Sequence, residues 1–160
     1  MPDKLTPKFE ISVEGAPVAP EVIEKVVSIT VRQDLEMADT VEVRLANDDL
    51  RFTEGAIFDE GKKLSVKLGY VETDLVLLGT GTIVRRECEF PVAGPAVLTV
   101  LAFGKKFKMR QGKKSKNFND MKVSDIVQQL AGEEGLQAEI DDTSEVVPYM
   151  LQMAKDNLTF

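Results

Sequence analysis

Across the first two thirds of the chain, hydrophobic and polar residues alternate in short runs that end at turn residues. In residues 26–33, for example, Val27, Ile29 and Val31 alternate with polar residues, which places all three on one buried face. A period of two is typical of half-buried strands, and it predicts strands over residues 9–13, 26–33, 40–48, 63–71, 75–90 and 96–103. Six short strands with no convincing helix among them predict a mainly β fold, either a sandwich or a small antiparallel barrel. We favour the barrel because a closed sheet has no open edge to protect.

The pattern changes at about residue 117. Apolar residues then recur at helical spacing and are followed by glycines that can end a helix; they are Met121, Val123, Ile126, Val127 and Leu130. Short strands are expected over 136–142 and 146–154, and Asp156 or Asn157 stands where a helix N-cap belongs. The prediction is a first domain over residues 1–105, followed over 106–160 by a linker and the beginning of an α/β domain that looks truncated.

The composition, with 43% hydrophobic and 29% charged residues among 160, is that of a soluble globular protein. The sequence has no histidine, which excludes Ser-His-Asp and Cys-His catalysis and histidine zinc sites. A single cysteine, Cys88, cannot form an internal disulfide and indicates synthesis in a reducing compartment, the cytoplasm. The N-terminal segment lacks the apolar region of a signal peptide, and no apolar run could span a bilayer. We expect no cofactor, no metal and no membrane span.

Seven basic residues crowd into residues 105–116 of a chain whose net charge is −7. A phosphate-binding loop is excluded because Phe107 occupies the position where that motif needs its first glycine. The GTGT at 79–82 opens no helix, so glycines at a strand bend explain it better than a dinucleotide site. Direct nucleic-acid binding is disfavoured because the rest of the chain is acidic. A solvated connector between domains stays open as an alternative.

Carboxylate pairs are the remaining enzymatic option. Four adjacent pairs lie in or beside expected turns, where acidic residues usually face solvent or cap backbone groups; they are Asp48–Asp49, Asp59–Glu60, Glu133–Glu134 and Asp141–Asp142. Nothing around them would raise a pKa as acid catalysis requires. We therefore predict no catalytic residue and no enzyme.

Three stretches together resemble the phage late-control D and VgrG-like hub proteins of contractile tails and injection systems. The first is VVSITVRQDLEMADTVEVRLAND, two strands joined by an acidic corner, and the second is the hairpin LGYVETDLVLLGTGTIVRRECEF. The third, KSKNFNDMKVSDIVQQLAGEEGLQAEID, is the most specific. It departs from the family pattern at Lys122, where a threonine would cap the helix, so the helix start here is expected to rest on Asp120 or Ser124.

The resemblance implies a homotrimer in which each chain contributes two related barrels, so that three chains form a pseudo-sixfold ring. Such a ring joins the tail tube to the spike, and its partners would be the tube protein, a spike or spike-tip protein and other baseplate proteins. The particle would be a virion tail or a contractile injection particle. Rival interpretations are a tail-tube ring protein, a tail-associated carboxylate-based cell-wall hydrolase and a stand-alone ligand-binding barrel. On the hub hypothesis the basic stretch contacts another protein, and the candidate interface residues are Lys105, Lys106, Lys108, Arg110, Lys113 and Lys114.

Overall fold

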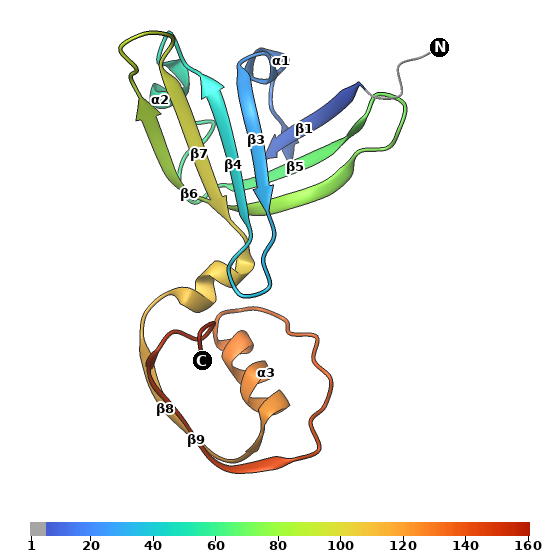
Figure 1. Cartoon of the computed structure of the whole chain (residues 1–160), viewed down its shortest axis with the longest axis vertical. Helices are drawn as coiled ribbons and strands as arrows, with labels where there is room; N and C mark the ends of the chain where they lie inside the picture. The colour runs from blue at the N-terminus through green and yellow to red at the C-terminus, as the bar shows by residue number, and fades with distance from the viewer. Residues whose placement is uncertain (1–5) are drawn as a thin grey trace. The chain divides into compact units, whose positions relative to one another are not determined.

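The computed structural model describes residues 6–160 of the chain; the first five residues, with which the predicted first domain begins, lie outside the described part. Two compact units are present, one made of the residues before Leu35 and Ala38–Gly104, the other of Leu35–Met37 and Lys105–Phe160. The first unit is a single antiparallel sheet in the order β2-β1-β5-β6-β7-β4-β3 (Figure 1). Its strands are β1 Pro7–Val13, β2 Ala16–Pro17, β3 Val26–Arg32, β4 Thr40–Ala46, β5 Lys63–Tyr70, β6 Val76–Glu89 and β7 Val97–Phe103.

The long strand β6 folds this sheet over, because its two halves pair with different neighbours. Its first half pairs with β5 and its second half with β7, and Thr82 lies opposite residues of both. A register shift interrupts each ladder beside this point, and such bulges bend a strand. Gly79 and Gly81 lie at the bend, and a Cβ on Gly81 would come within 2.6 Å of the Phe103 carbonyl oxygen. The GTGT segment is therefore a strand bend, as predicted.

The core of the first unit lies on the inner face of the folded sheet. Alternate residues of β4 and β7 are buried, including Val43, Leu45 and Val100. Two one-turn helices that the periodicity did not predict, α1 Pro20–Ile23 and α2 Arg51–Glu54, add Val22 and Phe52 to this core. Each is a single turn, too short to show a helical period.

The prediction of a mainly antiparallel β fold is confirmed. All six predicted strands are present within a few residues of their expected bounds. The sheet ends at β2 and β3, and among the described residues no pairing joins these two strands to close a barrel. One residue assignment was wrong: Val27 is 58% exposed, because a register shift between Val26 and Ser28 makes it the unpaired residue of a bulge.

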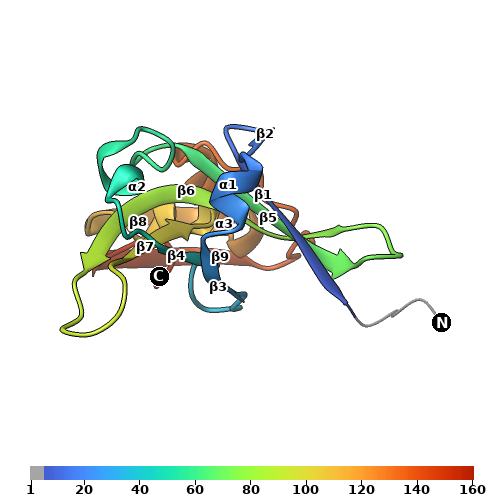
Figure 2. The same ribbon diagram turned by 90° about the horizontal axis from the view of Figure 1, so that it is seen from above.

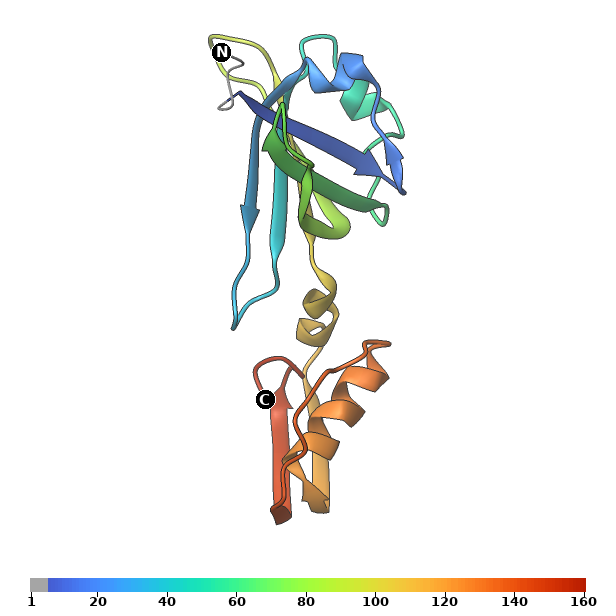
Figure 3. The same cartoon turned by 90° about the vertical axis from the view of Figure 1, so that its right-hand side faces the viewer.

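The second unit packs one helix against a two-stranded sheet (Figure 3). It consists of the 3-10 helix η1 Lys105–Arg110, strand β8 Lys114–Lys122, helix α3 Val123–Glu133 and strand β9 Val146–Lys155. The predicted helix and the strand over 146–154 are confirmed. The strand expected over 136–142 was wrong: residues 137–145 have no regular structure, and Asp142 and Thr143 bond to the start of α3 instead of extending the sheet. No helix of the described residues has the length and apolar character to cross a membrane.

Helix α3 begins with a cap supplied by a distant segment. Its N-cap residue is Lys122, not Asp120 or Ser124 as expected, and the Lys122 side chain caps no backbone group. The Ser124 N–H instead donates to the hydroxyl of Thr143 at 3.2 Å. Lys122 Nζ lies 2.9 Å from Asp142, and their hydrogen bond raises the pKa of Lys122 and lowers that of Asp142. The threonine missing at position 122 is thus replaced by one that lies 21 positions further along the chain.

Asp156 caps the turn formed by residues 157–159. Asp156 Oδ1 accepts hydrogen bonds from the N–H groups of Leu158 at 3.1 Å and Thr159 at 2.8 Å. The Asp156 carbonyl oxygen accepts a bond from the Phe160 N–H at 3.2 Å. Bonds from Thr159 lower the pKa of Asp156. Asp156 therefore caps this turn in the way that an N-cap side chain caps a helix, which agrees with one of the two predicted alternatives.

Candidate assembly surface of the second unit

The basic stretch forms the 3-10 helix η1 and the start of β8. Side chains three apart share one row of a 3-10 helix, so Lys105 and Lys108 form one exposed row and Lys106 belongs to the next. Arg110 and Lys113 are also exposed. Within residues 6–160, no acidic group forms an ion pair with Lys105, Lys108, Arg110 or Lys113. Four of the six predicted interface residues therefore present charge to solvent.

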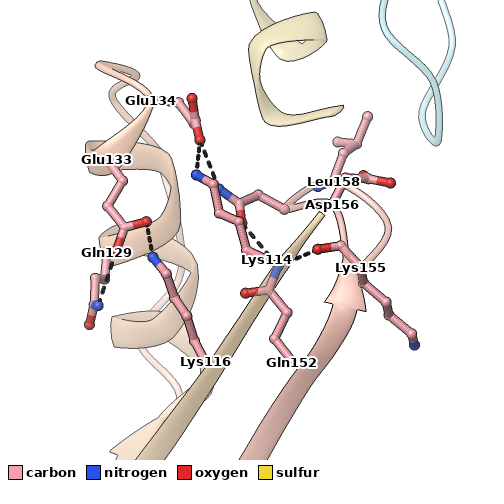
Figure 4. A network of polar contacts seen from close by, with 10 residues as sticks. Lys114, Lys116, Gln129, Glu133, Glu134, Gln152, Lys155, Asp156 and Leu158 are labelled. Atoms are coloured by element: carbon pink, nitrogen blue, oxygen red, sulfur yellow. Dashed lines mark hydrogen bonds and ion pairs between the residues drawn. The ribbon is translucent and has the colours of Figure 1, made fainter. Parts of the chain in front are cut away.

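Two lysines of the stretch are instead engaged within the chain. Lys114 pairs with Glu134 and Lys116 with Glu133, at the end of α3 (Figure 4). The bond from Lys116 is the main reason that the pKa of Glu133 lies below its ordinary value of 4.5. Lys114, one of the predicted interface residues, therefore has its charge matched inside the second unit.

A buried polar network continues from this pair (Figure 4). Asn157 Nδ2 donates to Glu134 Oε1 at 2.9 Å, and Asn157 Oδ1 accepts from Gln152 Nε2 at 3.0 Å. Gln152 Nε2 also donates to the Lys155 carbonyl at 3.0 Å, while Gln152 Oε1 is buried without a donor among the described residues. The network connects β8, α3 and β9 to the last turn. The sequence pattern gave no role to these two amides, although Gln152 shares the inward parity of Met150 in β9.

The apolar core of the second unit is small. Phe118 of β8 packs with Ile126 and Leu130 of α3, and its ring stacks on Phe160 with centroids 5.8 Å apart. A two-stranded sheet is marginal by itself, so packing against α3 is needed for its stability. The polar network and this core together fix the end of the basic stretch to the rest of the unit.

An apolar groove of about 550 Å³ opens beside α3. One wall is a helical stripe, and the other comes from η1, β9, the segments that follow α3 and β9, and Leu35 of the segment between β3 and β4. The large apolar residues are Leu35, Met109, Val123, Ile126, Val127, Leu130, Leu136, Met150, Leu158 and Phe160. Val123 and Val127 are each 39% exposed. Among the described residues that line the groove, Lys106 alone is charged. The helical period predicted the helix that carries this stripe, but it did not show which of the five apolar positions face outward.

In each of the other adjacent pairs, at least one carboxylate contacts a basic group. Asp48 lies 3.4 Å from Lys25, and Asp59 lies 3.2 Å from Arg86. No cluster of three or more potential metal ligands occurs in the part of the chain that the structure describes.

Known proteins share this fold over nearly the whole chain. The prophage MuSo2 43 kDa tail protein from Shewanella oneidensis is similar with a TM-score of 0.71 and 11% identity. The E. coli c3393 protein is similar with a TM-score of 0.61 and 12% identity. It is a component of the type VI secretion system with structural similarity to the T4 bacteriophage tail proteins gp27 and gp5. The tail protein from Neisseria meningitidis MC58 is similar with a TM-score of 0.59 and 16% identity.

These similarities cover 96%, 94% and 94% of this chain but only 46%, 40% and 42% of the three proteins. The chain thus spans less than half the length of each. Comparison with curated protein sequences gives no match. The model of one protein family, the Alg8 N-terminal domain, matches residues 3–158. The chain therefore belongs to the Alg8 N-terminal domain family.

Proposed function

We propose that the chain is a structural component of a contractile phage tail or injection system, and within it the baseplate hub. Three copies would form a pseudo-sixfold ring that joins the tail tube to the spike. Residues 1–105 would supply the first, β-rich hub domain and residues 106–160 part of an α/β domain. The chain would act by geometry and not by catalysis, as a late-control D or VgrG-like protein.

The observation that supports this proposal is a similarity that runs through both units. Two of the three solved structures are tail proteins and the third is a secretion-system component similar to tail proteins, and each covers at least 94% of this chain. The order of a β-rich unit followed by a small α/β unit is therefore shared, not the sheet alone. The boundary between Gly104 and Lys105 lies one residue before the proposed division, and Leu35–Met37 cluster with the second unit.

The oligomeric state tests the ring. Light scattering on the purified full-length product should give three times the mass of one polypeptide. A stable monomer that never enters a tail-like particle would contradict the hub. Turnover of peptidoglycan by the same preparation would favour the hydrolase alternative.

The basic stretch is the proposed assembly interface. Replacing Lys105, Lys108 and Lys113 by Gln should lower the yield of assembled particles and leave folding intact, because these side chains are exposed and form no ion pair in the described chain. The matched control replaces three exposed basic residues elsewhere, Lys8, Arg32 and Lys155. If the two triple variants assemble equally well, the basic stretch is a solvated connector and not an assembly interface.

A further inference from the structure

The groove beside α3 leaves large apolar side chains open to solvent in the second unit. In α3, Ile126 and Leu130 are buried, whereas Val123 and Val127 lie one turn apart and are each 39% exposed. Residues i and i+4 are neighbours on a helix surface, so these two valines form a continuous apolar strip. The volume of about 550 Å³ lies within the usual range of binding pockets, ~300–1,000 Å³.

The edge of the groove formed by η1 carries only positive charge. Among the described lining residues Lys106 is the only charged one, and it lies in the same 3-10 row as Met109. The neighbouring row carries Lys105 and Lys108, both exposed. No acidic residue occurs anywhere between positions 105 and 119. A segment that fills the groove would therefore meet positive charge at the η1 edge.

We propose that this groove binds an acidic amphipathic helix of a partner protein, with two or three large apolar side chains inserted beside Val123 and Val127 and carboxylates facing the Lys105–Lys108 row. Apolar anchors at i, i+3 or i+4 and i+7 of a bound helix match a groove whose wall is itself a helical stripe of two turns. Charge complementarity then selects against neutral and basic helices. The groove would act in this way whether or not the chain assembles into a tail.

Three synthetic helical peptides test the proposal on the full chain by fluorescence anisotropy. The first has leucines at i, i+3, i+4 and i+7 with glutamates on both flanks; the second has lysines in place of the glutamates, and the third has serines in place of the leucines. At low ionic strength the glutamate peptide should bind at least about tenfold more tightly than either other peptide. Its advantage over the lysine peptide should shrink at high salt, because exposed charges are screened.

Variants locate the binding surface. Val127→Glu should weaken binding of the glutamate peptide at least about tenfold, whereas Val76→Glu, at a 60% exposed valine of β6, should leave it unchanged. The double variant Lys105→Glu, Lys108→Glu should reverse the preference toward the lysine peptide, and Lys155→Glu should not. Circular dichroism confirms that each variant is folded.

Equal affinity for the glutamate and lysine peptides would overturn the charge selection, and the proposal with it. So would the absence of binding to all three peptides, or an affinity that Val127→Glu leaves unchanged. A failure of trimer formation with normal peptide binding would instead refute the hub ring and leave the groove as proposed.

Discussion

Gly81 lies where β6 changes partners, and its replacement by alanine tests how the first unit is folded. At an open site in a strand, alanine in place of glycine normally adds ~0.5–1 kcal/mol of stability. At Gly81, however, a Cβ would lie 2.6 Å from the carbonyl oxygen of Phe103 and 2.7 Å from its carbonyl carbon. Both are backbone atoms of β7, which cannot rotate away as the end of a side chain can.

The expected cost follows from this geometry. Ordinary contact for a Cβ begins near 3.4 Å, so β6 and β7 would have to separate by up to about 0.8 Å, which is 3.4 Å minus 2.6 Å. Overpacking costs ~1–3 kcal/mol, and a weakened backbone hydrogen bond at the neighbouring Thr82–Phe103 pair adds ~1 kcal/mol. We expect a loss of ~2–4 kcal/mol, a fall in Tm of roughly 10–25 °C for a unit of this size.

Thermal and urea unfolding followed by circular dichroism measures this loss. Gly79→Ala should also destabilise the unit, because its Cβ would lie 2.6 Å from a methyl group of Val41, a buried β-branched side chain with a restricted rotamer. Gly132→Ala is the control: it has nothing within 4 Å and lies in α3, so it should gain up to ~1 kcal/mol. If Gly81→Ala were as stable as the parent chain, the close approach of β6 to β7 would be wrong.

Two further predictions concern the second unit. Thr143→Val removes the hydroxyl that accepts a hydrogen bond from the Ser124 N–H and should lower the free energy of unfolding by ~1 kcal/mol, as measured by urea unfolding. If the additional substitution Lys122→Thr restores the stability, the loss is one of helix capping. A Thr143→Val variant as stable as the parent chain would refute the cap. The pKa of Glu133 is lowered in the folded chain, so its ion pair with Lys116 contributes stability above the ordinary value of 4.5 that is lost as pH falls through the folded pKa. Unfolding measured from pH 6 to pH 3 should therefore show a smaller acid loss for Glu133→Gln than for the parent chain, and identical pH profiles would contradict the pairing.

Much of the first unit could be predicted because each strand buries one face and alternates. β4 shows the strict pattern, with Val41, Val43 and Leu45 buried. Prediction failed where the backbone breaks the period: Val27 occupies a bulge, and a bulge leaves no mark in a hydrophobic pattern. Whether the sheet closes depends on whether its two edge strands pair, and the alternation of hydrophobic residues within each strand carries no information about that pairing.

The second unit could be predicted in its helix and its last strand, but not in its contacts. The cap of α3 comes from Thr143, and local spacing pointed to nearer residues. The pairs of Lys114 and Lys116 with α3 also join positions far apart in the sequence. A basic stretch that looked uniform therefore divides into lysines that stabilise the unit and lysines that face solvent.

A reconstruction of tail particles by cryo-electron microscopy would test the hub function most directly. We predict three copies of the chain in one pseudo-sixfold ring where the tail tube meets the spike. Copies stacked along the length of the tube would identify a tube protein instead, and absence of the chain from the particle would contradict a structural role in the tail.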